Sequence, residues 1–377
     1  LRMTMTTQKI HIAVLFGGCS GEHEVSLMSA RSILNVLHPD RYAVTPVGIT
    51  RDGRWWMGEN VLEKLAQESL DGLTAVTMLP EPGNHVLYAL EEGPSGRALR
   101  PVTPVDVIFP VLHGTFGEDG TLQGLFEILG IAYVGAGVLG SAVGMDKALF
   151  KDVMRAYRLP VLDSMLVNRH EIETRLDEIL LKAESLSNYP FFTKPANLGS
   201  SVGIRKCRSR EELYQGLVEA ARFDRRVMIE RGIEARELEV SVLGNAEVRV
   251  SAVGEIFPAE EFYTYAAKYL DRGTRLAVPA DLEEGAARRI QELARRAYLA
   301  VDAAGMARVD FLMEKTSGKV YISEINTIPG FTTVSMYPKL WEASGLSYTA
   351  LVDELIRLAL ERQAERRATE HTYRSAA

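Results

Sequence analysis

The sequence predicts a chain of α/β and α+β type, in which an N-terminal parallel-sheet domain is followed by two further units with shorter strands. In the N-terminal part, short apolar runs alternate with helical periodicity, which is typical of a parallel sheet covered by helices on both faces. In the last part, strand-like runs follow one another with one amphipathic helix between them. The 377 residues, 46% of them hydrophobic, also exceed the roughly 250–300 residues at which single cores stop growing.

The first predicted strand, 10–16, is an apolar run that ends at Gly17 and Gly18, which favour a tight turn. The helical spacing of apolar residues over 24–37 predicts a helix directly after it. The remaining elements expected in this unit are strands at 43–49, 105–111 and 131–134, a helix at 122–129, and a surface loop or hairpin at 81–101. We expect this N-terminal domain to end near Gly144 and to span residues 1–144.

A helix is predicted to begin at Asp146 and to end at Pro160. It opens a small α+β domain over residues 145–233, with strands expected at 161–167, 191–193 and 227–230. The last domain, residues 234–377, is predicted from strands at 238–243, 248–253, 306–312 and 320–325. Its segment 257–281 has no clear periodicity but carries Lys268 and Tyr269, and an aromatic segment of this length is typical of a functional loop.

Two neighbouring predicted strands carry polar residues of the kind that hold a metal ion. Counting back from a three-residue turn at 316–318 places Asp310 opposite Glu324 and Arg308 opposite Asn326, all on one face. Two facing carboxylates repel each other unless a cation lies between them. Oxygen ligands favour Mg²⁺ or Mn²⁺ over zinc. The sequence therefore predicts a metal site here, and the alternative is a solvated strand face on which Arg308 neutralises an acid.

A second candidate site follows the predicted strand at 191–193. Lys194 ends this strand, and the loop after it contains Gly199, Ser200, Ser201 and Gly203. Small residues let backbone N–H groups approach phosphate oxygens, and the hydroxyl groups add donors. The sequence is not a Walker loop, since GxxxxGK[ST] does not occur. An ordinary β-hairpin turn remains the alternative.

A literal GxGxxG occurs at Gly135, Gly137 and Gly140. A dinucleotide site would also need an acidic residue at the end of a following strand about 20 residues on, and the sequence has none. We therefore interpret these glycines as sites of close backbone packing where the first two domains meet.

Two residues at the expected edge of the parallel sheet are further candidates. Ligands of open parallel sheets bind beyond the carboxyl ends of the strands. Glu24 lies near the first helix start and could bind an ammonium group, although a first-turn carboxylate is also favoured by the helix dipole alone. His113 follows another strand, and a structural histidine is the alternative there.

Composition limits the class of protein. The net charge of −7 disfavours nonspecific binding to nucleic acid or acidic lipid. No apolar run approaches the roughly 20 residues of a membrane-spanning helix. Cys19 and Cys207 are too few for a disulfide framework, which fits a reducing compartment. These features predict a cytoplasmic protein that acts on soluble molecules, without a nucleic-acid or membrane partner.

Seven segments together resemble the D-alanine–D-alanine ligases of the ATP-grasp superfamily, in the order found in that family. They extend from Val14 to Pro338 and read GGCSGEHEVSLMSA, PVLHGTFGEDGTLQGLFE, GSAVGMDK, KPANLGSSVGI, EFYTYAAKY, ARVDF and EINTIPGFTTVSMYP. The resemblance implies an N-terminal substrate domain followed by an ATP-grasp fold, whose small subdomain is 145–233 and whose large subdomain is 234–377.

The resemblance implies roles for residues near the first substrate. Glu24 would hold the amino group of the first D-alanine, with Ser200 and Tyr269 linked to it by hydrogen bonds. His113 would lie near that substrate's carboxylate. Lys268 and Tyr269 would belong to a mobile loop that closes the site.

It also implies roles around the reacting groups and the nucleotide. Arg308 and the backbone N–H of Gly330 would stabilise the oxyanion, and Ser335 and Met336 would bind the carboxylate of the second D-alanine. The residues expected to contact ATP are Lys147, Lys194 and Ser201 near the phosphates and Glu230, Arg231, Ile233 and Glu237 near adenine and ribose. Asp310, Glu324 and Asn326 match the metal ligands of the family, in agreement with the strand-register argument.

The implied activity is the ATP-dependent ligation of two D-alanine molecules through an acyl phosphate, for peptidoglycan synthesis, with Mg²⁺ or Mn²⁺ as two ions and a homodimer as the assembly. The alternatives are a D-alanine–D-lactate ligase, another ATP-grasp carboxylate–amine ligase, and an inactive nucleotide-binding regulator. Tyr269 in AAKY disfavours the D-lactate ligase, and the segment GGCSGEHEVS disfavours another carboxylate–amine ligase. The intact metal and phosphate residues disfavour an inactive regulator. Cys19, where the family often has threonine, and ANL before GSSVG leave only the subfamily open.

Overall fold

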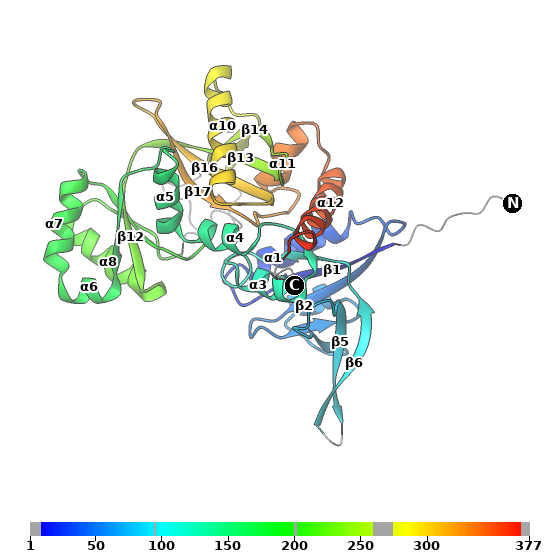
Figure 1. Cartoon of the computed structure of the whole chain (residues 1–377). Helices are drawn as coiled ribbons and strands as arrows, with labels where there is room; N and C mark the ends of the chain where they lie inside the picture. Colours follow the sequence, from blue (N-terminus) through cyan, green and yellow to red (C-terminus); the bar gives the residue numbers. More distant parts are fainter. Residues whose placement is uncertain (1–8, 94–95, 200–201, 259–273, 371–377) are drawn as a thin grey trace, which may run out of the picture.

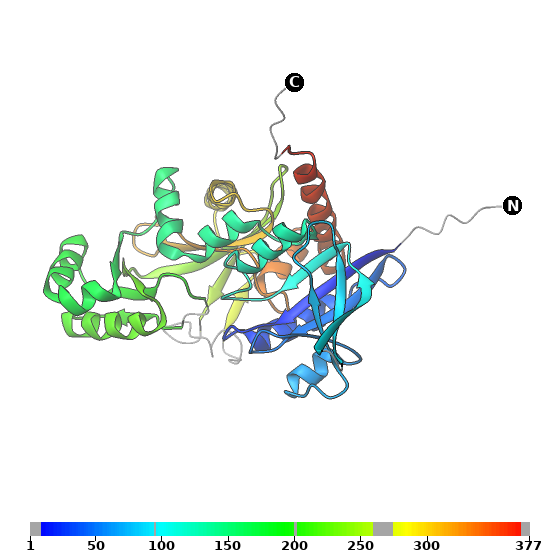
Figure 2. The same cartoon turned by 60° about the horizontal axis from the view of Figure 1, so that its bottom comes forward.

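The computed structural model describes residues 9–93, 96–199, 202–258 and 274–370. In this part the chain forms three sheets of eight, four and five strands. The molecule is elongated, with the N-terminal sheet towards one end and the four-stranded sheet with its helices at the other (Figures 1 and 2). None of the helices in these residues is both long enough and apolar enough to span a membrane.

The N-terminal sheet has the strand order β6-β5-β4-β3-β2-β1-β7-β8. Its strands are β1 (Ile10–Gly17), β2 (Tyr42–Ile49), β3 (Trp55–Met57), β4 (Thr74–Met78), β5 (Val86–Gly93), β6 (Gly96–Pro104), β7 (Val107–Val111) and β8 (Ala132–Tyr133). The expected parallel pairing holds for β2, β1, β7 and β8, whereas the other four strands are antiparallel. The expected loop or hairpin at 81–101 is the β5–β6 hairpin, which projects from the molecule (Figure 1).

Both faces of this sheet are covered where it is parallel. Ile12, Val14 and Phe16 belong to one buried cluster, and the alternate residues Ala13 and Leu15 belong to another. This explains why β1 is a continuous apolar run. The helices that provide the covering side chains are α1 (His23–Leu34) and α2 (Val61–Ala66) on one face, α3 (Thr121–Leu129) on the other, and α12 (Tyr348–Arg367) over β7 and β8.

The four-stranded sheet is antiparallel, with the order β11-β10-β12-β9. Its strands are β9 (Ser164–Asn168), β10 (Phe191–Pro195), β11 (Arg205–Cys207) and β12 (Arg226–Arg231). Its helices are α6 (Arg169–Thr174), α7 (Leu176–Leu186) and α8 (Arg210–Phe223). Ser209 caps α8 by accepting a hydrogen bond from the Glu212 N–H at 3.2 Å. Phe191 and Ile229 pack on these helices, whereas the alternate residues Phe192, Lys194 and Glu230 line a cleft on the other face.

The five-stranded sheet is also antiparallel, with the order β15-β14-β13-β16-β17. Its strands are β13 (Ala235–Gly244), β14 (Arg249–Phe257), β15 (Arg275–Ala277), β16 (Gly305–Glu314) and β17 (Val320–Asn326). Its helices are α10 (Glu284–Ala300) and α11 (Met336–Ala343), and α4 (Val138–Met145) lies against β17.

Helix α5 (Lys147–Ala156) begins at its cap Asp146, whose carboxylate accepts the Leu149 N–H at 2.9 Å. Its residues Phe150 and Met154 are buried in the same cluster as the five-stranded sheet and α10. The domain boundaries predicted at 144 and 233 group α5 with the four-stranded sheet, although α5 packs on the five-stranded sheet. These boundaries stay a prediction.

The glycines of the GxGxxG segment lie in close backbone contact. A Cβ at Gly140 would meet the Asp302 carbonyl oxygen at 2.8 Å, and a Cβ at Gly305 would meet the Gly135 backbone at 3.1 Å. Close backbone packing is therefore confirmed at Gly135 and Gly140, but its predicted place was wrong: the partners are Asp302 and Gly305, just before β16 and at its start, and not residues where the first two predicted domains meet.

Candidate active site

A cleft of about 1770 Å³ is lined by residues of the four- and five-stranded sheets, of the start of α1, and of the loop after β7. Of the predicted site residues that the structure describes, it brings together His113, Lys147, Lys194, Glu230, Arg231, Ile233, Glu237, Arg308, Asp310, Glu324, Asn326, Gly330, Ser335 and Met336. Ser200, Ser201, Lys268 and Tyr269 lie outside the described residues, as does most of the segment 257–281. Glu24 is the exception, since it does not line the cleft.

The strand register at the predicted metal site is the expected one. Asp310 pairs with Glu324 and Arg308 with Asn326 across β16 and β17. The turn, however, differs from the three-residue turn expected at 316–318. The Glu314 N–H donates to the Lys319 carbonyl at 2.9 Å, so four residues form the turn. A bulge at Ser323 restores the register, because Phe311 pairs with Ile322.

The side chains on this strand face form one charged cluster. Arg308 donates two hydrogen bonds to Asp310, from Nε at 2.7 Å and from Nη2 at 2.6 Å, and lies 3.0 Å from Glu239. Burial works against this guanidinium charge, but Asp310 and Glu239 hold the pKa of Arg308 well above its ordinary value. Arg308 is therefore a permanent cation beside the two facing carboxylates.

The donor set in this cluster fits a hard divalent cation. Asp310 and Glu324 provide carboxylate oxygens, and Asn326 provides an amide that contacts Asp310 at 3.0 Å. Such a set suits Mg²⁺, which keeps part of its shell for water and phosphate. Among the described residues, no group of three or more His, Cys, Asp or Glu side chains is placed as a metal site, so a metal here would depend on the amide and on a bound ligand.

Lys147 and Lys194 reach the same cleft from different elements. Lys147, the first residue of α5, donates to the Leu198 carbonyl at 2.7 Å and lies 3.5 Å from Glu324. Lys194, near the end of β10, forms an ion pair with Glu230 on β12. Two lysines of this kind offer positive charge to an anionic ligand such as a polyphosphate.

Lys151 is a third lysine of this cluster, and sequence reasoning missed it. It is 1% exposed and forms an ion pair with the second carboxylate oxygen of Glu230. Although burial opposes ionisation of Glu230, Lys151 and Lys194 lower its pKa to about 2. Burial lowers the pKa of Lys151 itself. The signal in the sequence was the spacing, since Lys151 is one helical turn after Lys147 on the same helix.

The far end of the cleft is formed by the chain after β17 and by the start of α11. A Cβ at Gly330 would lie 3.2 Å from Ser335 Oγ, so these two predicted residues are neighbours. Ser335 is the N-terminal cap residue of α11, and Met336 is the first residue of that helix. A helix start offers free backbone N–H groups to an anion such as a carboxylate.

The position of Glu24 requires a correction. Its side chain is 59% exposed and forms an ion pair with Arg51, outside the cleft. Glu22 lines the cleft instead and is 8% exposed. The physical reason is that α1 begins at His23, which turns Glu24 towards solvent. Helical spacing could have identified Glu22, since it shares a face with the buried residues Ser26, Ser29 and Ile33.

A second buried carboxylate missed from the sequence is Glu118, on the loop after β7. Burial, together with the charge of Glu22 nearby, raises the pKa of Glu118 to about 8. Glu118 and Glu22 therefore form an acidic group beside His113, at one end of the cleft.

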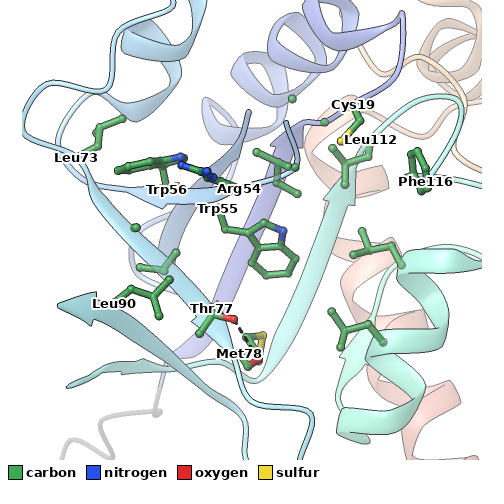
Figure 3. Close-up of a pocket in the computed structure, with 18 of the residues that line it drawn as sticks. Cys19, Arg54, Trp55, Trp56, Leu73, Thr77, Met78, Leu90, Leu112 and Phe116 are labelled. Atoms are coloured by element: carbon green, nitrogen blue, oxygen red, sulfur yellow. Dashed lines mark hydrogen bonds between the residues drawn. The ribbon is translucent and has the colours of Figure 1, made fainter. Parts of the chain in front are cut away.

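A separate cavity of about 1030 Å³ lies beside the antiparallel part of the N-terminal sheet (Figure 3). Figure 3 shows Trp55 and Leu112 beside the cavity, with Cys19 and Phe116 towards one side of it. It meets the large cleft at His113, which lines both. Its other lining residues include many apolar side chains. Because the phosphate- and metal-type residues gather in the large cleft, we place the candidate active site there.

Two family descriptions match this chain. Residues 11–136 match "D-ala D-ala ligase N-terminus", and residues 153–357 match "D-ala D-ala ligase C-terminus". The chain is 50% identical over 361 residues to a D-alanine–D-alanine ligase of Heliobacterium modesticaldum, covering 95% of this chain and 97% of that protein. It is also 50% identical to a D-alanine–D-alanine ligase of a Thermoanaerobacter species, covering 95% of this chain and 99% of that protein.

Solved structures agree with these matches. The D-alanine–D-alanine ligase from Coxiella burnetii has a TM-score of 0.81 and 38% identity, covering 95% of this chain and 96% of that chain. A D-Ala:D-Ser ligase from Enterococcus faecalis has a TM-score of 0.82 and 36% identity, covering 93% of this chain and 100% of that chain.

Proposed function

Because this chain belongs to the D-alanine–D-alanine ligase family, we propose that its cleft joins two D-alanine molecules through the residues that line it. The protein is an ADP-forming ligase of the ATP-grasp fold, and its reaction serves peptidoglycan synthesis. The observation that carries the proposal is the collection of Arg308, Asp310, Glu324, Lys147 and Lys194 in one cleft.

ATP and a divalent metal ion take part in this reaction. We propose two Mg²⁺ ions, replaceable by Mn²⁺, held by Asp310, Glu324 and Asn326 together with phosphate oxygens. Bound metal would offset the charge of the phosphates and of the developing leaving group. Lys147 and Lys194 contribute positive charge in the same cleft, Lys147 at 3.5 Å from Glu324. Ser201 is assigned to the same phosphates because the resemblance implies it.

The nucleotide base and ribose are assigned to the part of the cleft between β12 and β13. Glu230 and Arg231 end β12, and Ile233 and Glu237 follow on the way into β13. Arg231 is held in place by a hydrogen bond to the Tyr321 hydroxyl at 3.3 Å. A wall that combines an apolar side chain with carboxylates suits a purine base and ribose hydroxyls.

The first D-alanine is assigned to the end of the cleft near Glu22, whose buried carboxylate would pair with the substrate ammonium. His113 lies beside it, and Ser200, Lys268 and Tyr269 are assigned to the same substrate. Its carboxylate attacks the terminal phosphorus of ATP, so that a new C–O–P bond forms and ADP leaves. The resulting acyl phosphate provides phosphate as a leaving group, which a free carboxylate lacks.

The second D-alanine attacks the acyl carbon with its neutral amine, after its ammonium group has lost a proton. Arg308 and the Gly330 N–H are assigned to the negative charge that develops on the carbonyl oxygen. Ser335 and the start of α11 at Met336 are assigned to the second carboxylate. The tetrahedral intermediate then collapses to the dipeptide and inorganic phosphate.

We further propose a homodimer that acts in the cytoplasm, with the chain divided into the substrate domain 1–144 and the ATP-grasp subdomains 145–233 and 234–377. The soluble substrates and the two free cysteines, Cys19 and Cys207, support the location.

The test is ADP and phosphate formation from ATP with D-alanine, L-alanine, D-serine, D-lactate or no addition. We expect D-alanine to stimulate turnover and to give D-alanyl-D-alanine, and L-alanine to do neither. D-Serine and D-lactate are then offered with D-alanine as second substrates, with the products identified by mass spectrometry. Equal turnover with both alanine enantiomers, AMP as product, or a dominant D-alanyl-D-lactate product would each contradict the proposal.

A further inference from the structure

The chain around Gly330 is held on its N-terminal side by two residues of the N-terminal sheet region. Glu118 accepts a hydrogen bond from the Ile328 N–H at 3.3 Å. The His113 Nδ1–H donates to the Ile328 carbonyl at 2.9 Å. Both backbone polar groups of Ile328 are therefore fixed from the same loop, which follows β7 and carries Glu118 and His113.

The chain is held on its C-terminal side in the same way. The Phe331 N–H donates to Ser29 Oγ at 3.2 Å, and the Tyr348 hydroxyl donates to the Phe331 carbonyl at 2.5 Å. Ser29 is on α1 and is fully buried, and Tyr348 is the first residue of α12. Gly330 thus lies between two residues whose backbone groups are fixed by side chains distant in sequence.

One hydrogen bond joins the two sides. Ser29 Oγ lies 3.1 Å from His113 Nε2. Because Nδ1 donates to the Ile328 carbonyl, Nε2 of a neutral His113 accepts a hydrogen bond from the Ser29 hydroxyl, and Ser29 Oγ in turn accepts one from the Phe331 N–H. Burial lowers the pKa of His113, which agrees with a neutral ring. Each donor in this network then has one acceptor.

The same loop also borders the first-substrate end of the cleft. The Gly114 N–H donates to the other oxygen of Glu118 at 3.0 Å. A Cβ at Gly114 would lie 2.7 Å from Glu22 Oε2, so the Glu22 carboxylate packs directly on this loop. Glu118 therefore connects the residue that faces the first substrate with the chain that carries Gly330.

We propose that Glu118 and Ser29 are positioning residues for the Gly330 peptide. They hold its N–H in the orientation needed when negative charge develops on the acyl oxygen. They also couple this orientation to the first-substrate end of the cleft through the loop after β7. The inference rests on the proposed function, because the Gly330 N–H has its role only in acyl transfer. Neither side chain needs to touch the reacting atoms.

Two substitutions test it. Ser29→Ala removes the acceptor of the Phe331 N–H and the donor to His113. Glu118→Gln keeps the size of the side chain but leaves one of its two backbone N–H donors facing an amide NH₂ group. Glu59→Gln and Ser185→Ala are matched controls, since both residues are exposed and distant from the network. Tyr348→Phe is a milder third variant that removes one hydroxyl and keeps the ring against Phe331.

We expect kcat to fall about 10–100-fold in Ser29→Ala and in Glu118→Gln, because displacing one oxyanion donor weakens transition-state binding. The KM for ATP should change less than about threefold. Affinity for a tetrahedral phosphinate analogue of the transition state should fall by the same factor as kcat/KM. The Ser29→Ala/Glu118→Gln double variant should lose much less than the product of the two single losses, because both side chains hold the same short segment, 328–331, around Gly330.

Full activity in both single variants would overturn the inference, and so would a loss confined to the KM for D-alanine with unchanged affinity for the analogue. If either variant fails to fold, Tyr348→Phe tests the inference in its place, and its kcat is compared with its affinity for the analogue in the same way. A wild-type protein without D-alanine-dependent ADP formation would instead contradict the proposed function, so the two failures are distinguishable.

Discussion

The buried group Lys151–Glu230–Lys194 leads to a quantitative prediction about stability. Glu230 and Lys151 are each 1% exposed, so water screens their interaction poorly. The lowering of the Glu230 pKa from 4.5 to about 2 corresponds to about 3 kcal/mol at about 1.4 kcal/mol per pKa unit. Lys151 and Lys194 share this contribution, and of the two only Lys151 is fully buried.

The perturbation is Lys151→Met, which keeps the length of the side chain and removes its charge. We expect the free energy of unfolding at pH 7 to fall by about 2 kcal/mol. The value is below the roughly 3–5 kcal/mol typical of breaking a buried pair, because Lys194 remains and because burial already disfavours the charge of Lys151. Replacing Glu230 by Gln in the same chain should recover part of the loss, since no buried carboxylate is then left with a single partner.

The sign of the pH dependence follows from the Glu230 pKa. Because this pKa is lower in the folded than in the unfolded chain, the contribution is present above about pH 4.5 and is lost as the pH falls towards 2. The difference between the wild type and Lys151→Met should therefore be full at pH 7 and should shrink below pH 4.5.

Urea unfolding followed by circular dichroism measures this difference, with exposed Lys182→Met as the control. If Lys151→Met unfolds within about 0.5 kcal/mol of the Lys182→Met control at pH 7, the electrostatic reasoning is wrong.

Two predictions concern the active site directly. Glu324→Gln should abolish turnover while leaving the circular dichroism spectrum unchanged, because it removes a carboxylate from the facing pair. Glu342→Gln, at an exposed position, is the control. An active Glu324→Gln enzyme would refute the metal assignment. Glu22→Gln should lower kcat/KM for D-alanine about 10–100-fold, as expected for a lost charged hydrogen bond, whereas Glu24→Gln should stay within about threefold. ADP formation at several D-alanine concentrations separates these two variants, and the opposite order would restore Glu24 to the site.

The sequence predicted most of the fold because its strands carry strong patterns. The parallel strands were identified from continuous apolar runs, which exist because both faces of β1 are buried. The short strands β3 and β4 were missed. Each lies in an antiparallel extension of the sheet, where β3 has only three residues and lacks a clear alternation.

The metal strands show why part of a site is predictable and part is not. The facing of Asp310 and Glu324 was predicted correctly, although the turn was one residue longer than expected and Ser323 formed an unexpected bulge. The two differences cancel. Neither a bulge nor a turn length is encoded in the alternation of side chains, so the agreement depended on both.

The error at Glu24 has another physical origin. Glu22 and Glu24 are separated by one residue, and only the start of α1 at His23 decides which one faces the cleft. The exact start of a helix is weakly specified by local sequence. Glu22 and Glu24 lie on either side of the start of α1, so only the buried face of the helix could distinguish them. Lys151 and Glu118 depend on contacts over long sequence separations, which local patterns do not contain.

The packing of α12 on the first sheet has a consequence for how the chain folds during synthesis. Leu351, Leu355 and Ile356 complete the cluster that contains Ile12 and Val14, so more than 300 residues separate the first and the last residues of this core along the chain. On the ribosome, α1 and α2 emerge early and cover their part of this face, yet the part over β7 and β8 stays uncovered until α12 emerges. Contacts of such long sequence separation slow folding. A nascent chain of this protein therefore carries uncovered apolar surface over β7 and β8 for most of its elongation, and a chaperone that shields such surfaces would have its longest opportunity to bind there.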